Sequence, residues 1–240
     1  MPRISKATEY NWKKLNSDSN GKLTKRANKT QSKKRIIATS YLDDSKANML
    51  LKNVLMVESS VENIMYTLAY SALSQNGLLQ KPHVKEFIQK YSHLKHVSID
   101  IPNDTWDSEN DVLGFIYQSL ITEGERNITG QYYTCKSVVE YIVGDKVLSD
   151  TETFLDPCCG SGAFLMAVKT NNPANLYGFD SNPTAVMIAS VNLLIRHKDK
   201  EFCPHVFCLD FLSNNLFTTD SRNELPFKFD NIYTNPPWGS

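Results

Sequence analysis

From residue 137 onward, short apolar runs alternate with amphipathic runs, and this alternation constrains the fold more than any other feature of the sequence. Strands are expected over residues 153–157, 176–180, 205–209 and 229–234, and helices over residues 137–148, 162–170 and 183–196. Pro183 stands in the first turn of the last helix, where its missing N–H is tolerated. Strands that alternate with helices predict a parallel sheet with right-handed crossovers, which is an α/β fold.

The unusual residues of this half follow the expected strands, and ligands of parallel sheets bind beyond the carboxyl ends of the strands. The first strand runs into DPCCGSGAFL, where Gly160 and Gly162 let the backbone turn sharply and approach a ligand closely. This G-x-G alone is a weak signal, because the third glycine of the dinucleotide fingerprint is missing. Asp180 ends the next strand, 20 residues beyond Gly160, where a carboxylate is placed to bind ribose hydroxyls. A helix cap before Pro183 is the alternative, although Ser181 or Asn182 would cap at least as well.

Two further strand ends carry polar and aromatic side chains. Asp210 could accept a hydrogen bond from an exocyclic amine, and Phe211 could cover a purine ring. The last strand leads into Asn235-Pro236-Pro237-Trp238, in which two prolines fix φ and remove two donors. The turn therefore presents the Asn235 side-chain carbonyl and the Pro236 carbonyl beside a flat indole, which suits a planar amine. A structural turn with a core Trp is the alternative.

The first half of the chain has a different pattern. Residues 41–125 are expected to be helical, with one helix or two over residues 45–74, another over 84–91, and a helix from Asp111 to Gly124. Residues 1–35 hold eleven Lys and Arg against two acids, a net charge of +9, so the remainder of this formally neutral chain carries −9. Residues 1–40 are therefore interpreted as a basic arm, expected to be disordered, that could also bind phosphates.

The composition excludes several classes of protein. No apolar run approaches the ~20 residues that a membrane span needs, and the N-terminus has no apolar core of a secretory signal. We therefore expect a cytoplasmic protein. The odd count of five cysteines predicts free thiols. Cys203, His205 and Cys208 form no clean ligand quartet, and no metal is expected.

Taken together and in order, DPCCGSGAFL, GFD, LDF and NPPW resemble the motifs of amino-methyltransferases that use S-adenosylmethionine. Upstream, GQYYTCKSVVEYIV and DVLGFIYQSL resemble the segments that precede the glycine loop in adenine-specific DNA methyltransferases of the restriction–modification type. The resemblance covers roughly residues 110–240. It implies that residues 126–240 form the first half of a Rossmann-like methyltransferase domain, with an incomplete sheet.

The resemblance also implies roles for individual residues. Asn235, Pro236, Pro237 and Trp238 are expected to hold the substrate base and carry catalysis. S-adenosylmethionine is the implied cofactor, and its expected contacts are Tyr132, Tyr133, Thr134, Asp156, Gly160, Gly162, Phe164, Asp180, Asp210 and Phe211. The sequence departs from the family at Cys135, where a proline usually follows Tyr-Tyr-Thr.

The implied reaction is methyl transfer to the N6 amine of adenine in double-stranded DNA. Transfer to RNA or to a protein glutamine remains an alternative, as does a non-catalytic fragment or split subunit. The family continues for several strands after the Asn-Pro-Pro turn, so this chain is expected to be a gene fragment, one half of a split enzyme or a shortened version. A second chain or specificity subunit would then complete it.

Overall fold

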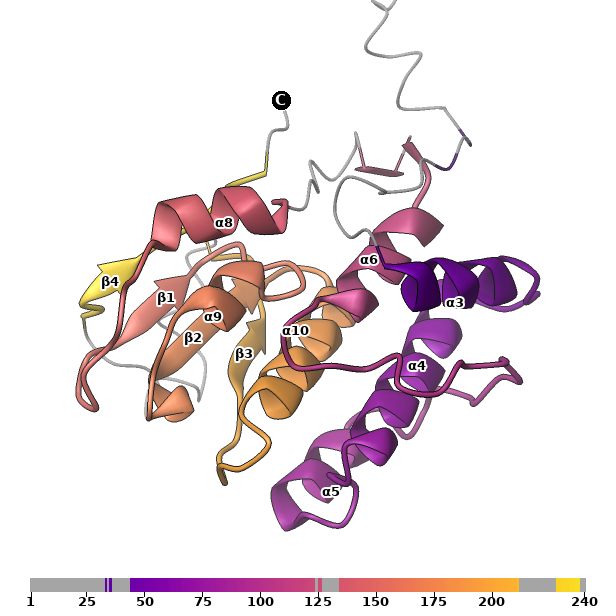
Figure 1. Cartoon of the computed structure of the whole chain (residues 1–240), viewed down its shortest axis with the longest axis horizontal. Coiled ribbons are helices and arrows are strands. Elements are labelled where there is room, and N and C mark those ends of the chain that lie inside the picture. The colour runs from indigo at the N-terminus through magenta and orange to yellow at the C-terminus, as the bar shows by residue number, and fades with distance from the viewer. Residues whose placement is uncertain are drawn as a thin grey trace, which may run out of the picture.

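The computed structural model describes residues 33, 35, 44–123, 125–126, 134–211 and 228–237 of the chain (Figure 1). Its helices are α3 (Ser45–Leu55), α4 (Val61–Gln75), α5 (Pro82–Gln89), α6 (Val112–Leu120), α8 (Lys136–Val143), α9 (Ala163–Ala167), α10 (Pro183–Arg196) and the short 3-10 helix η1 (Pro173–Asn175). Its strands are β1 (Phe154–Asp156), β2 (Leu176–Asp180), β3 (His205–Cys208) and β4 (Asn231–Ile232).

The four strands form one parallel sheet with the order β3-β2-β1-β4. The register pairs Asp156 with Gly178 and Asp180 with Cys208, so the last residues of three strands lie close to one another. This arrangement confirms the expected α/β fold. β2 and α10 begin and end at the residues that the sequence pattern predicted.

One face of the sheet is covered by α9 and α10, and α8 packs on α9 (Figure 1). α10 is buried along its length, from Thr184 to Ile195, because it lies between β2 and β3 on one side and α4 and α6 on the other. A helix that is apolar on all sides needs such a position. Pro183 begins it, and the Asn182 side chain caps it by accepting from the N–H groups of Thr184 and Ala185.

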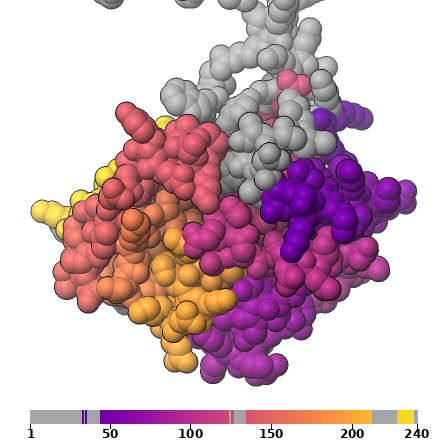
Figure 2. Space-filling model, viewed as in Figure 1, coloured from indigo at the N-terminus to yellow at the C-terminus, as the bar shows by residue number. Residues whose placement is uncertain are grey.

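The N-terminal helices α4 and α6 pack on α10. They thereby contact the sheet half, the part of the chain from α8 to β4, and Figure 2 shows the two parts in contact. A single hydrophobic cluster runs from Ala47 in α3 to Phe202 before β3. The predicted helical stretch over residues 45–74 divides into α3 and α4, since Ser60 caps a new helix. The helical region and the sheet therefore share one core.

Three helices are shorter than predicted, and each ends for a reason that the structure shows. α6 ends at Leu120, because Thr122 and Glu125 form a reciprocal capping box that begins a new turn. α8 ends at Gly144. α9 ends at Ala167, because Lys169 pairs with Val147 in an isolated parallel bridge.

All five cysteines are free thiols, as predicted. None of the helices in the described ranges is both long and apolar enough to cross a bilayer. Most of the predicted basic arm, residues 1–32, 34 and 36–40, lies outside the described residues. The backbone of Arg35 pairs with Thr122 in an antiparallel bridge just beyond α6.

Candidate active site

Acidic side chains gather where the parallel strands end. Asp156 ends β1, Asp180 ends β2, and Asp210 follows β3 by two residues. β4 leads through Tyr233 and Thr234 to Asn235, and its neighbour in the sheet is β1. Because the strands are parallel and adjacent, these four positions lie along one edge of the sheet, which is the edge where α/β proteins bind ligands.

The glycine loop is fastened to the end of β2. The N–H of Cys159 donates to the carbonyl of Phe179 at 2.8 Å, and the N–H of Gly160 donates to the Asp180 carboxylate at 3.0 Å. Gly162 has a φ of +89°, and an added Cβ would lie 3.2 Å from the Cβ of Ala189 in α10. Only glycine combines this conformation with so close an approach to a neighbouring helix.

Asp180 holds the loop rather than capping a helix. Its carboxylate accepts from the N–H of Gly160 and, at 2.8 Å, from the N–H of Asn182, while Asn182 itself caps α10. Burial raises the pKa of Asp180, and the two N–H donors lower it. The cap interpretation of Asp180 was therefore wrong, and its proposed ribose contact stays a prediction.

Asp156 is a buried acid at the centre of the edge, with its side chain 1% exposed. Its carboxylate accepts from the N–H of Cys158 at 3.1 Å. Burial raises the Asp156 pKa to about 7; the Cys158 N–H and the Thr234 hydroxyl oppose that rise, and the Asp180 carboxylate adds to it. At neutral pH the group is therefore divided between its two protonation states.

The electrostatic character of this edge suits a cationic ligand. Burial raises the pKa of the Cys158 thiol, and Asp156, Asp180 and Asp210 each raise it further. The charged side chains that shift the Asp156 and Cys158 pKa values are all acidic. S-adenosylmethionine carries a sulfonium and an ammonium group, so its charge complements that of the residues present. In the described part of the chain, no three His, Cys, Asp or Glu side chains are placed to hold a metal ion.

Asn235 is positioned by a residue about one hundred positions earlier in the chain. Its side-chain N–H donates to the Thr134 hydroxyl at 3.1 Å, just before α8 begins. The amide nitrogen is thus directed to Thr134, and the amide oxygen is the atom that can accept from a substrate amine. Pro236 and Pro237 follow as exposed residues with trans peptide bonds.

The remaining predicted site residues lie in different surroundings. The Phe211 ring packs 5.3 Å from the ring of Phe179, on the face of the sheet away from α10. Phe164, in α9, is 3% exposed and points into the main hydrophobic core. Tyr132, Tyr133 and Trp238 lie outside the described residues.

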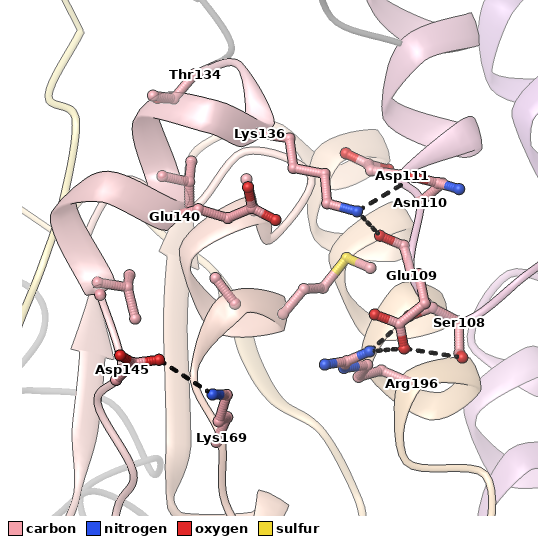
Figure 3. A pocket seen from close by; sticks show the side chains of 16 residues that line it. Ser108, Glu109, Asn110, Asp111, Thr134, Lys136, Glu140, Asp145, Lys169 and Arg196 are labelled. Atoms are coloured by element: carbon pink, nitrogen blue, oxygen red, sulfur yellow. Dashed lines mark hydrogen bonds and ion pairs between the residues drawn. The ribbon is translucent and has the colours of Figure 1, made fainter. Parts of the chain in front are cut away.

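A cavity of about 520 Å³ lies between α8, α9 and residues 108–111 (Figure 3). Its lining includes Thr134 and Asp111 but neither Asp156 nor Asp180, so it lies beside the acidic strand ends rather than at them. Its cations are engaged: Arg196 pairs with Glu109, Lys169 with Asp145, and Lys136 donates to the Glu109 carbonyl (Figure 3).

The sequence pattern gave no sign of this cavity, because its lining residues come from four separate segments. The same pattern missed Ser161 and Asn192, which both hydrogen-bond to Asp111. A buried asparagine in a largely apolar helix was the available signal, since such a group needs a partner.

Comparison with known proteins gives two kinds of match. A family model described as N-6 DNA Methylase matches residues 108–240. The Type II methyltransferase M.VspI of Vibrio sp. (strain 343) is 35% identical over 137 residues, which cover 53% of this chain and 30% of that protein. The Type I restriction enzyme MjaIX methylase subunit of Methanocaldococcus jannaschii is 28% identical over 159 residues, 62% of this chain and 26% of that protein.

A third relative, the Type I restriction enzyme HindI methylase subunit of Haemophilus influenzae, is 32% identical over 103 residues, covering 38% of this chain and 23% of that protein. This chain thus spans no more than 30% of the length of these relatives. No solved structure matches the chain.

Proposed function

This chain belongs to the N-6 DNA methylase family, and from that premise we propose that it takes part in methyl transfer from S-adenosylmethionine to the N6 amine of adenine in double-stranded DNA. The observation that carries the proposal is the placement of Asn235 beside the acidic strand-end edge, with its amide nitrogen held by Thr134. A group that accepts from an amine then stands next to a site suited to a cationic methyl donor.

The cofactor would be held along the strand ends. Asp180 would bind its ribose, the loop from Asp156 to Gly162 would border it, and Asp210 and Phe211 would contact its adenine. Tyr132, Tyr133, Thr134 and Phe164 complete the proposed set. When bound, S-adenosylmethionine supplies a methyl group made electrophilic by a positively charged sulfur.

Asn235 would activate the target amine by geometry. The lone pair of an adenine N6 amine is delocalised into the ring, so the amine is a poor nucleophile. The amide oxygen of Asn235 and the carbonyl of Pro236 would accept hydrogen bonds from the two N–H groups of the amine and so direct its lone pair toward the methyl group. Catalysis is then alignment together with stabilisation of the positive charge that develops on nitrogen.

An adenine inside a duplex is out of reach of this site, so the base has to swing out of the stack. Pro237 would stiffen the turn, and Trp238 would stack on the extruded base. No general base is required, since the methylated ammonium that forms is strongly acidic. Its proton leaves to solvent after transfer.

Two relatives are by name methylase subunits of Type I restriction enzymes. We therefore propose that this chain works within a restriction–modification system and together with a further chain, such as a specificity subunit. The N-terminal helical region and the sheet half are proposed as its two ordered parts, in a cytoplasmic protein. The basic arm is proposed to contact phosphates.

Transfer of a tritiated methyl group tests the proposal, with unmethylated DNA, RNA and protein offered in parallel. We expect label on DNA, recovered as N6-methyladenine after digestion. Label on RNA or on protein glutamine would replace the DNA proposal. Transfer that requires an added chain would identify a split enzyme, and cofactor binding without transfer under either condition would identify a non-catalytic subunit.

The Asn235→Ala variant isolates the proposed catalytic group. We expect it to lower kcat by about 10²–10³-fold with intact cofactor binding, by analogy with loss of one preorganised polar group. Asn175→Ala is the matched control. Asn175 lies just before β2 begins, at the opposite end of the strand from the candidate site, and its side-chain amide donates to the Asp150 carbonyl. Equal activity in both variants would contradict the role of Asn235.

A further inference from the structure

The carboxylate of Asp111 joins three elements that are distant in the sequence. It accepts from the N–H of Gly114 at 2.7 Å and so caps α6. It also accepts from the Asn192 side chain of α10 at 2.7 Å, and from the hydroxyl of Ser161 in the glycine loop. The residue that caps α6 thus contacts the loop proposed to hold the cofactor.

Both partners of Asp111 are buried, and they also contact each other. Ser161 is 0% exposed and Asn192 is 5% exposed. The Asn192 side chain donates a second hydrogen bond, at 3.0 Å, to the backbone carbonyl of Ser161. The loop is therefore held at Ser161 by two hydrogen bonds. Asp111 accepts the one from the side chain, and Asn192 donates the one to the backbone carbonyl.

Ser161 stands between the two glycines whose backbone forms the proposed cofactor contact. Gly160 donates to Asp180, and Gly162 is packed against Ala189 of α10. A displacement of Ser161 would move both neighbours, because one residue separates them. The Ser161 hydroxyl donates to Asp111 and the residue is 0% exposed, so its removal would affect cofactor binding through the position of the loop.

The space for the Asp111 carboxylate is secured by Gly114. A Cβ added at Gly114 would lie 2.1 Å from a carboxylate oxygen of Asp111. Glycine in the first turn of a helix is unfavourable, so its presence here is explained by the close approach of the carboxylate. The first turn of α6 therefore leaves room for the Asp111 carboxylate.

We infer that Asp111 is a positioning residue for the cofactor loop, which it holds through Ser161 and Asn192. The inference rests on the proposed function, because it assigns the loop to S-adenosylmethionine. A consequence is that attachment of α6 and affinity for the cofactor are coupled. Loosening the contact at Asp111 weakens cofactor binding without removing any group that touches the cofactor.

Two substitutions of Asp111 separate position from charge. Asp111→Ala removes every contact of the carboxylate. Asp111→Asn keeps an oxygen for Gly114 and Asn192, and its amide can donate to the Ser161 hydroxyl, so it retains the geometry without the charge. Asp44→Ala is the matched control, because Asp44 caps α3 by accepting from the N–H of Ala47 at 2.7 Å and its described side-chain bond is to that helix alone.

The measurement is the Kd for S-adenosylmethionine by calorimetry, with the Tm of each variant. We expect Asp111→Ala to raise the Kd by about tenfold or more, as loss of buried, charge-assisted hydrogen bonds would. Asp111→Asn should restore most of the affinity, and Asp44→Ala should lower the Tm with an unchanged Kd. An unchanged Kd in Asp111→Ala overturns the inference. So does an Asn variant as weak as the Ala variant, or an Asp44 control with an equal loss.

If Asp111→Ala fails to fold, Ser161→Ala takes its place. Its control is Ser190→Ala, since Ser190 is also buried, at 3% exposed, but its hydroxyl donates within α10, to the Val186 carbonyl at 2.8 Å. A raised Kd for Ser161→Ala alone supports the inference, and equal values in the two variants overturn it.

Amide hydrogen exchange of the loop provides a readout that needs no cofactor. The amides of Gly160 and Gly162 should exchange faster in Asp111→Ala or Ser161→Ala than in the corresponding control. If the unaltered protein binds no cofactor but this difference is present, the proposed function fails and the positioning role stands. If cofactor binds and exchange is the same in all variants, the positioning role fails.

Discussion

The ionisation of Asp156 should control how tightly the strand-end edge binds its cofactor. Burial raises the pKa of this carboxyl to about 7, the Cys158 N–H and Thr234 hydroxyl lower it, and Asp180 adds to the rise. A bound sulfonium and ammonium would favour the carboxylate and lower that pKa. Cofactor binding is then linked to proton release, and affinity increases as the pH rises through about 7.

The magnitude follows from the pKa shift. If binding returns the pKa to an ordinary carboxyl value of about 4, the Kd should fall about tenfold between about pH 6 and about pH 8. The empty protein should show the opposite trend. Its folded state binds more protons than its unfolded state between about pH 4 and about pH 7, so stability falls across that window by up to about 4 kcal/mol.

Calorimetric titrations in buffers of different ionisation enthalpy measure both the Kd and the protons released. Asp156→Asn is the control, because its side-chain oxygen can still accept from the Cys158 N–H at the 3.1 Å position but does not titrate. The control retains the titration of the cofactor's own amino group. If the two proteins show the same pH dependence, Asp156 does not carry the linked proton and the reasoning is refuted.

Three further predictions concern stability and DNA binding. Gly162→Ala should destabilise the fold by about 1–3 kcal/mol in urea unfolding, because of its φ of +89° and the Cβ of Ala189 at 3.2 Å; an unchanged midpoint would contradict the close packing. Leu165→Ala, at a side chain that is 0% exposed, should cost about 2–5 kcal/mol in the same assay, and a cost below 1 kcal/mol would show that the site is not packed as described. Removal of residues 1–35, which carry a net charge of +9, should weaken DNA binding at low salt and flatten its dependence on salt concentration; an unchanged salt slope would exclude the arm from phosphate contact.

Local signals predicted the elements that carry their own boundaries. α10 was predicted to the residue because Asn182 caps it and Pro183 begins it. β2 was predicted equally well, since an apolar run ends at a charged residue. α6 was predicted to extend too far, because the helical pattern hid the capping box of Thr122 and Glu125. The Thr-x-x-Glu spacing of this box is nevertheless present in the sequence.

Long-range contacts were beyond local reasoning. The bridge between Val147 and Lys169 shortens α9, yet neither residue is of a type that would indicate the bridge in the sequence. The bond from Asn235 to Thr134 joins residues about one hundred positions apart. The sequence placed the candidate site at the strand ends because topology alone requires it, whereas the loop attachment at Asp111 depends on the packing of α6 against α10, which no period or spacing encodes.

The central claim is that the strand-end edge, rather than the cavity beside α8, receives S-adenosylmethionine. Ultraviolet crosslinking of the radiolabelled cofactor, followed by peptide mapping, tests this claim most directly. We expect the label in peptides that contain residues 156–162, 180–182 or 233–237. Label in residues 136–145 or at Lys169, which line the cavity, or no label that excess unlabelled cofactor suppresses, would contradict the account.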